Sequence, residues 1–225
     1  MNAHIDIERQ RFNMVEQQIR TWEVLDQQVL DLLFEVRREE FVPPQYRSLA
    51  FVDMEIPLTD NATAGARMLA PKLEARMLQE LAIKPANRIL EIGTGSGYMT
   101  ALLAKRGAHV TSVEIVPAFS AAASARLKAH GIANVTLEIG DGARGWNKAS
   151  PYDVIVLTGS VPVLADEFQR SLKPGGRLLA VVGEAPVMQA RLTTCAGGGA
   201  CDTVTLFETC IATLRNAPQP ERFVF

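Results

Sequence analysis

Three glycines form the part of the sequence best suited to holding a ligand. Gly93, Gly95 and Gly97 follow the short apolar run 88–92 and precede a stretch with helical spacing. Glycines at such a strand-to-helix turn let the backbone bend sharply and let a ligand lie directly on it. Because a glycine motif alone is a weak signal, the residues around it decide what it could bind.

Two acidic residues stand where the next strands are expected to end. Glu114 follows the glycines by about twenty residues, the spacing at which a carboxylate accepts hydrogen bonds from both hydroxyls of a ribose. Asp141 and Gly142 follow the third strand, and Asp141 could accept a hydrogen bond from an adenine amino group. Ligands of open α/β sheets bind at the carboxyl ends of the strands, so these groups should share one nucleotide site.

The spacing and charge of the glycine turn favour one kind of nucleotide. A dinucleotide motif has its third glycine or alanine at the position of Tyr98, whereas here that glycine comes one residue earlier. Glu91 precedes the glycines, where a carboxylate would repel a pyrophosphate but attract an ammonium or sulfonium group, directly or through water. We therefore expect S-adenosylmethionine rather than NAD. The residues expected to bind it are Glu91, Gly93, Thr94, Gly95, Gly97, Glu114, Ile115, Asp141 and Gly142.

Alternating strand and helix patterns around this site predict a doubly wound, mainly parallel α/β sheet. Residues 1–70 are expected to form a helical N-terminal extension, irregular over 46–65, and residues 71–225 the cofactor-binding core of a single domain. A glycine-rich turn over 196–200 should join a closing antiparallel pair of strands. The expected strands are 88–92, 109–115, 135–139, 152–157, 177–182, 188–194 and 204–214, and the expected core helices are 71–81, 100–106, 118–130 and 164–172.

Composition and charge are those of an ordinary globular protein. The chain has 225 residues, of which 48% are hydrophobic and 21% charged, and its net charge is -2. This balance gives no electrostatic reason to expect nucleic acid or an acidic membrane as a partner. No apolar run approaches the roughly 18 residues that span a bilayer, and the polar N-terminus does not resemble a signal peptide. We therefore expect a cytoplasmic protein, and the sequence leaves its oligomeric state open.

The cysteines and histidines do not suggest a metal site. We interpret Cys195, Cys201 and Cys210 as free thiols in a reducing compartment. The three histidines are scattered along the chain, and none stands beside a cysteine at ligand spacing. No metal is therefore expected.

Several segments, in order along the chain, resemble the motifs of class I methyltransferases that use S-adenosylmethionine. They are residues 91–98, 113–114, 140–142 and 172–177. Within that class, the chain from about Arg11 onward resembles the protein-L-isoaspartate O-methyltransferase family. The segments that carry this closer resemblance are 14–20, 38–43, 50–53, 142–146 and 222–224.

The resemblance implies that the protein methylates the carboxylate of isoaspartyl residues, so that damaged proteins or peptides containing them are the expected partners. A carboxylate is already ionised at neutral pH, and the reaction needs no strong general base. Aligning the oxygen, the methyl carbon and the sulfur can carry the catalysis. A site without histidine therefore fits, and we interpret His109 and His130 as structural residues.

The chain departs from the family on the acceptor side. The family has a Thr-Ile-Ser-hydrophilic-Pro segment before the helix that begins here at Pro71, and its serine hydroxyl is taken to position the substrate. Leu69 occupies the serine position and cannot donate a hydrogen bond. The arginines of 67–76 could serve structure, substrate binding or subunit contact, and the sequence does not decide between these roles.

Other hydroxyl groups could replace the missing serine. Thr59 and Thr63 lie in the preceding loop, and Thr158 and Ser160 follow the strand 152–157, where they could instead cap the next helix. Thr158 and Thr63 are the candidate catalytic residues. Two alternatives stay open, namely a less polar acceptor such as a small molecule, and a cofactor-binding module that has lost catalysis.

Overall fold

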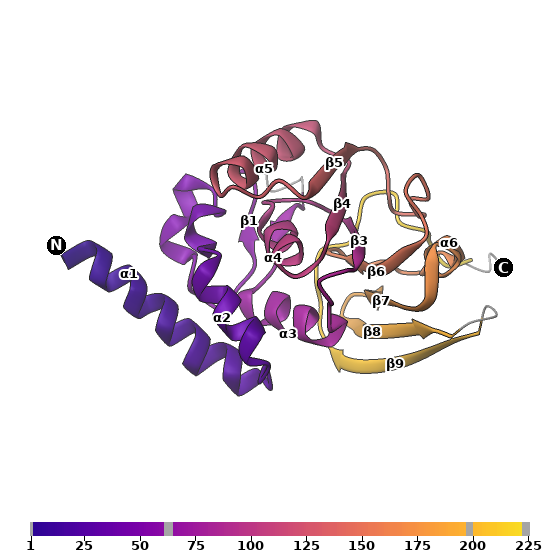
Figure 1. Ribbon diagram of the computed structural model, residues 1–225, viewed down its shortest axis with the longest axis horizontal. Coiled ribbons are helices and arrows are strands. Elements are labelled where there is room, and N and C mark those ends of the chain that lie inside the picture. The colour runs from indigo at the N-terminus through magenta and orange to yellow at the C-terminus, as the bar shows by residue number, and fades with distance from the viewer. Residues whose placement is uncertain (1, 61–64, 197–199, 222–225) are drawn as a thin grey trace.

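The computed structural model describes residues 2–60, 65–196 and 200–221, with a large central sheet (Figure 1). Its strand order is β5-β4-β3-β6-β7-β8-β9. The first five of these pair in parallel, and β8 and β9 add an antiparallel pair at one edge. This arrangement confirms the predicted fold class. The strands are β3 (Arg88–Ile92), β4 (His109–Glu114), β5 (Val135–Ile139), β6 (Tyr152–Leu157), β7 (Leu172–Glu184), β8 (Val187–Cys195) and β9 (Cys201–Glu208).

The strand order reverses beside β3, because the chain runs outward through β4 and β5 and then returns to β6 on the other side of β3. The carboxyl ends at such a reversal leave a crevice in which ligands of open α/β sheets bind. The topology therefore places the glycine turn, which follows β3, at the centre of that crevice.

Helices cover both faces of the sheet, and alternate strand residues divide its core into two clusters. Ile89, Val154 and Val156 pack on one side with the N-terminal extension and helices α2 to α4. Leu90 and Ile155 point to the other side, where α6 packs. Burial on both faces explains the nearly continuous apolar strands. The helices are α1 (Asn2–Asn13), α2 (Gln27–Glu35), α3 (Pro71–Leu81), α4 (Tyr98–Arg106), α5 (Pro117–Ala129) and α6 (Asp166–Arg170).

The N-terminal extension is mainly helical, as predicted, but less regular than its periodicity suggests. A π-helical turn, Met14–Ile19, follows α1, which lies on the outside of the extension (Figure 1). The small hairpin of β1 (Ile56–Pro57) and β2 (Arg67–Met68) was not predicted, because strands of two residues carry no periodic signal. One core cluster contains residues of both the extension and the sheet. The division into a 1–70 extension and a 71–225 core stays a prediction.

Some predicted boundaries in the C-terminal half were wrong. The helix expected over 164–172 is limited to α6, because Leu172 already pairs with Tyr152 as the first residue of β7. The last strand ends at Glu208 rather than at Leu214, because the following residues turn back towards the loop after β6, where Leu214 donates to the Ser160 carbonyl. No helix in the described ranges is both long and apolar enough to cross a membrane.

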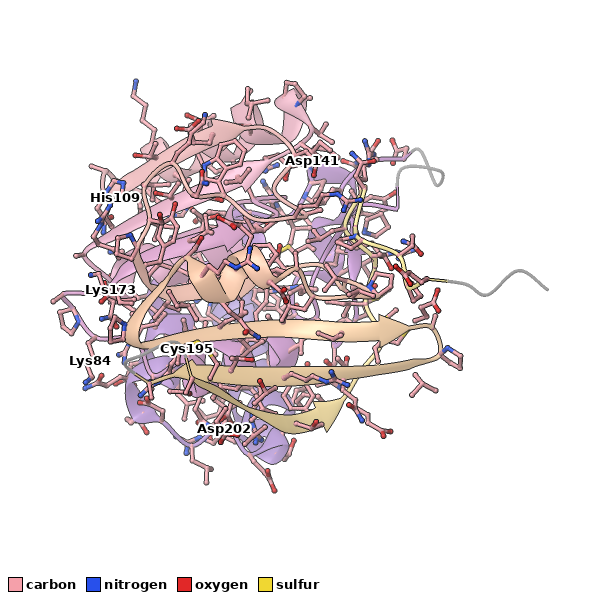
Figure 2. The ribbon with its side chains drawn as sticks, turned by 90° about the vertical axis from the view of Figure 1, so that its right-hand side faces the viewer. Lys84, His109, Asp141, Lys173, Cys195 and Asp202 are labelled. Carbon is pink, nitrogen blue, oxygen red and sulfur yellow. A yellow bond between two sulfur atoms is a disulfide. The ribbon has the colours of Figure 1, made fainter. Side chains whose placement is uncertain are left out.

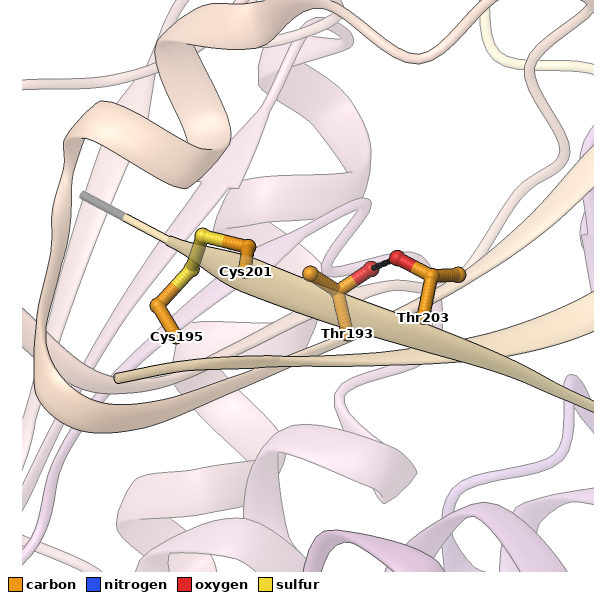
Figure 3. Close-up of a disulfide and its surroundings, with 4 residues drawn as sticks. All are labelled: Thr193, Cys195, Cys201 and Thr203. Carbon is orange, nitrogen blue, oxygen red and sulfur yellow. Dashed lines mark hydrogen bonds between the residues drawn. A yellow bond between two sulfur atoms is a disulfide. The ribbon is translucent and has the colours of Figure 1, made fainter.

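The interpretation of all three cysteines as free thiols was wrong. Cys195 and Cys201 form a disulfide that links the tips of β8 and β9 (Figure 3). The antiparallel register sets these two residues directly opposite each other, and such a register cannot be read from cysteine spacing. Only Cys210 is free among the described residues, and it is exposed. Because two of the three cysteines are paired, the cysteines do not indicate that the protein resides in a reducing compartment.

The disulfide lies far from the crevice, and its loss should have a small, local effect. Figure 2 shows Cys195 near Lys173, at the start of β7, and Asp141 at the opposite end of the sheet. Replacing Cys201 with serine should lower the free energy of unfolding by no more than about 2 kcal/mol, because the bond closes only a short loop. Urea denaturation measures this change, and Cys210→Ser is the matched control with no expected effect. Weaker cofactor binding by Cys201→Ser, measured by calorimetry, would contradict the separation of the two regions.

Candidate active site

A cavity opens at the carboxyl ends of β3 to β6, where the sequence placed the nucleotide site. Its wall contains six of the residues predicted to bind the cofactor, namely Gly93, Gly95, Glu114, Ile115, Asp141 and Gly142. The candidate catalytic residue Thr158 also lines it. The wall also contains Leu58 and Arg67 of the β1–β2 region and residues 212–215 near the C-terminus.

The glycine turn leaves the floor of the cavity without side chains. Gly93 and Gly95 have φ angles of 101° and 53°, which L-amino acids with side chains rarely adopt. A Cβ atom on Gly93 would lie 2.3 Å from Thr158 Oγ1, and one on Gly95 would lie 3.2 Å from Leu58 Cδ1. The missing side chains therefore let Thr158 and Leu58 pack against the turn, whose glycines still line the cavity.

Gly97, also predicted to bind the cofactor, lies where two helices pack together. It is not part of the cavity wall and instead precedes α4 as its N-cap. A Cβ atom at this position would lie 3.0 Å from the Cβ of Ala123, so the missing side chain allows α4 and α5 to pack closely. Thr94 is also outside the wall, because its buried hydroxyl pairs with that of Ser112 at 2.6 Å.

Glu114 connects the glycine turn to the end of β4. Its Oε2 atom accepts a hydrogen bond from the Gly95 amide, and its Oε1 atom accepts one from the Val116 amide, both at 2.9 Å. Each carboxylate oxygen has a further lone pair. The geometry therefore fits the expected binding of ribose hydroxyls, which stays a prediction.

Asp141 is held by its neighbours at the predicted adenine end. Its Oδ1 atom accepts a hydrogen bond from the Ala143 amide at 3.1 Å, and its Oδ2 atom accepts one from Asn216 Nδ2 at 2.9 Å. Gly142 beside it has no room for a side chain, because a Cβ atom would lie 2.9 Å from Ile92 Cδ1. These contacts fix the polar edge at which an adenine amino group is expected.

The structure does not support the predicted contact between Glu91 and the cofactor's ammonium group. Glu91 is fully buried and outside the cavity wall, and its Oε2 atom accepts hydrogen bonds from the hydroxyls of Thr100 at 2.5 Å and Ser112 at 2.6 Å. Burial raises the pKa of Glu91 to about 8, although these two hydrogen bonds oppose the rise. A carboxyl group that is largely protonated at neutral pH provides little charge to attract a cation.

The raised pKa of Glu91 makes stability depend on pH. Glu91 keeps its proton up to about pH 8 in the folded protein, whereas the unfolded chain releases it near pH 4.5. The contribution of Glu91 to the stability of the fold is therefore complete below pH 4.5 and is lost as the pH rises through about 8. The free energy of unfolding should fall by about 1.4 kcal/mol per pH unit at the steepest point. Urea denaturation across this interval should show a flatter dependence for Glu91→Gln. The exposed Glu35→Gln is the control, and an equal slope for Glu91→Gln and wild type would contradict the assignment.

The candidate hydroxyl groups are occupied by contacts within the protein. Thr158 Oγ1 donates to the main chain, with the Gly93 carbonyl at 2.5 Å and the Ile92 carbonyl at 3.0 Å. Ser160 is fully buried and donates to the Ile211 carbonyl at 3.1 Å. Neither residue caps α6, whose N-cap Ala165 makes no side-chain hydrogen bond. Both hydroxyls therefore connect the loop after β6 to neighbouring main chain. This role differs from the two that the sequence suggested, a catalytic hydroxyl and a helix cap.

Of the other two threonine candidates, the structure describes only Thr59. Thr59 is not among the residues that line the cavity. Thr63 lies outside the described residues, so its predicted catalytic role remains a prediction.

Leu69, at the family's serine position, belongs to the core rather than to the cavity. Its side chain is buried, and its carbonyl accepts a hydrogen bond from Arg38 Nη2 at 2.6 Å. Arg38 is fully buried, also donates to the Ala50 carbonyl at 3.0 Å, and forms an ion pair with Glu74. Sequence reasoning missed this arginine, although it lies within the family-like segment 38–43.

The fold and this cavity define a class I methyltransferase that depends on S-adenosylmethionine. The glycine turn, Glu114 and Asp141 line one cavity at the strand reversal, the place where ligands of open α/β sheets bind. The chain belongs to the protein-L-isoaspartate(D-aspartate) O-methyltransferase family, whose model matches residues 9–199.

Individual relatives agree with this assignment. A protein-L-isoaspartate O-methyltransferase of Anaeromyxobacter dehalogenans (strain 2CP-C) is 42% identical over 163 residues, which are 72% of this chain and 76% of the relative. A protein of Rhodopseudomonas palustris (strain HaA2), protein-L-isoaspartate O-methyltransferase 1, is 40% identical over 174 residues, covering 77% of this chain and 69% of that protein.

Solved structures show the same fold. A protein-L-isoaspartate O-methyltransferase superposes with a TM-score of 0.77 at 26% identity, over 90% of this chain and 65% of that chain. A Plasmodium falciparum structure, described as a putative protein-L-isoaspartate O-methyltransferase in complex with S-adenosyl-L-homocysteine, has a TM-score of 0.76 at 18% identity. That match covers 90% of this chain and 97% of the other.

Proposed function

We propose that the protein transfers the methyl group of S-adenosylmethionine to the carboxylate of L-isoaspartyl residues in damaged proteins and peptides. The observation that carries this proposal is a cavity lined both by the residues expected to bind the cofactor and by residues of the β1–β2 region and 212–215. Because a donor and an acceptor can enter the same opening, the cavity can align them for direct transfer.

The residues of the chain contribute mainly binding and alignment. Gly93 and Gly95 form part of the cavity wall expected to hold the methionine part of the cofactor, and the hydroxyl of Thr158 fixes this turn through the Gly93 carbonyl. Glu114 would bind the ribose. The cofactor supplies a methyl group on a positively charged sulfur. No described residue of the wall needs to remove a proton, because the acceptor carboxylate is already ionised at neutral pH.

Methyl transfer from labelled S-adenosylmethionine to an isoaspartyl peptide tests the proposal. The same peptide with a normal aspartyl residue is the matched control, and heat-inactivated enzyme gives the background. We expect transfer to the isoaspartyl peptide alone. Equal labelling of both peptides, or none above background, would overturn the assignment of the acceptor.

A different acceptor is the second candidate, and Leu69 is the observation that favours it. With a buried apolar side chain at the family's serine position, this chain lacks the hydroxyl associated with isoaspartyl substrates. Cofactor binding by calorimetry without peptide methylation would favour this candidate. A deletion strain with normal isoaspartate levels and a missing methylated metabolite would favour it further, whereas failure to bind cofactor would indicate an inactive module.

Isoaspartyl-containing proteins are the partners that follow from the leading proposal. Nucleic acid and membranes are not needed for it, and a cytoplasmic location remains a prediction of the sequence. The domain division and the oligomeric state are likewise not needed to explain the cavity.

A further inference from the structure

The acceptor side of the cavity needs a group that binds a carboxylate, and the expected hydroxyls do not provide one. The Thr158 hydroxyl donates to the main chain, Ser160 is fully buried, and Leu69 lies in the core. The acidic side chains of Glu114 and Asp141, in the same wall, accept hydrogen bonds from neighbouring groups and would repel an anionic acceptor.

Arg67 brings a positive charge to this wall. It lies on β2, in the position of the family's threonine, two residues before Leu69. Within the described residues, its guanidinium forms one ion pair, with Glu55 at 3.9 Å, a distance too long for a hydrogen bond. Its side chain is 46% exposed. The guanidinium donors thus remain available to a ligand.

The backbone around Arg67 is well positioned for this role. Arg67 pairs with Pro57, and the next residue, Met68, is buried and pairs with Ile56. Because side chains alternate along a strand, burial of Met68 turns Arg67 towards the open side. Leu58, which follows β1, lies over Gly95 in the turn expected to hold the methionine part of the cofactor. The β1–β2 region therefore faces the end of the cavity where the methyl group is expected.

Arg215 also lines the cavity, but it already has an interaction of its own. We propose that Arg67 binds the acceptor carboxylate and takes over the positioning role of the family's serine. This inference rests on the proposed function and specifies how that acceptor is recognised. A planar guanidinium matches a carboxylate in geometry and charge, and it can hold one carboxylate oxygen while the other faces the methyl group.

The charge change during the reaction fits this role. One carboxylate oxygen forms a bond to the methyl carbon while the bond between that carbon and sulfur breaks, and the bonding electrons move to the sulfur. The products are a neutral ester and a neutral thioether, and no proton is transferred. Arg67 therefore attracts the anionic substrate more strongly than the ester, which favours release of the methylated product.

Steady-state kinetics of Arg67→Met with the isoaspartyl peptide tests the inference. We expect the KM for the peptide to rise by about 10- to 100-fold, since a charge-assisted hydrogen-bonded pair is lost. The affinity for S-adenosylhomocysteine, measured by calorimetry, should stay unchanged. Arg67→Lys keeps the positive charge, so its KM for the peptide should rise less than that of Arg67→Met. Because salt screens charges, high salt should raise the KM of the wild type more than that of Arg67→Met. The exposed Arg47→Met, outside the cavity, is the matched control.

An unchanged KM for Arg67→Met would overturn the inference and leave the proposed function intact. If the affinity of Arg67→Met for S-adenosylhomocysteine falls by the same factor as its KM for the peptide rises, Arg67 binds the cofactor's own carboxylate. That result would overturn the inference. Absence of peptide methylation by the wild type would overturn the proposed function and, with it, this inference.

Discussion

Gly95→Val should lower the affinity for S-adenosylmethionine by at least about 100-fold, because two effects act together. A valine would have to adopt the φ angle of 53°, which is strongly unfavourable for a β-branched side chain. Its methyl groups would also enter the cavity on the surface expected to hold the methionine part, and its Cβ atom would already lie 3.2 Å from Leu58 Cδ1. Calorimetric titration with S-adenosylhomocysteine measures the loss directly.

Gly131→Val separates the two effects. Gly131 has a similar φ angle of 65°, but nothing lies within 4 Å of a Cβ atom built there. It follows α5 and does not line the cavity. We expect this variant to lose stability and to bind cofactor normally. Normal binding by Gly95→Val as well would mean that the cofactor does not lie on the glycine turn.

Arg38→Met should lower the free energy of unfolding by about 3–5 kcal/mol, as is usual when one partner of a buried ion pair is removed. The fully buried Arg38 guanidinium donates to the carbonyls of Ala50 and Leu69 and pairs with Glu74. Burial raises the pKa of Glu74, and the charge of Arg38 opposes that rise. Without Arg38, the carboxyl group must be buried alone or bind a proton. Urea denaturation at neutral pH measures the cost.

The neighbouring arginine offers a matched control for this prediction. Arg37 pairs with Glu40 at 3.4 Å, and its side chain is 52% exposed. Arg37→Met should therefore change the free energy of unfolding by less than about 0.5 kcal/mol. Adding Glu74→Leu to Arg38→Met should recover part of the lost stability, because no buried charge then remains. Similar losses for the two arginine variants would contradict the role assigned to Arg38.

The fold and the cofactor side of the cavity could be predicted because their signals are local. Apolar runs such as 152–157 reveal buried strands, and each strand end brings its following residues to the same edge of the sheet. This rule is enough to bring Glu114 and Asp141 into one wall with the glycines. The glycine turn itself is visible because few other residues tolerate its backbone angles.

Contacts between distant segments could not be predicted in this way. The side chain of Glu91 faces Thr100 and Ser112 instead of the cavity, and its spacing from the glycines does not reveal that direction. The link between Arg38 and the Leu69 carbonyl joins residues 31 positions apart, and no periodicity announces it. The pairing of Cys195 with Cys201 depends on the register of the hairpin. In each case, the decisive information is three-dimensional.

The hydrogen bond from Arg38 to residue 69 has a consequence for how this family can diverge. Arg38 binds the main-chain carbonyl, a group that every amino acid carries, so the path of the segment before α3 does not depend on the side chain at that position. A lineage could therefore exchange serine for leucine there without redesigning the surrounding backbone. The main chain of residue 69 thus fixes the path of the segment, while its side chain is left to fill the core.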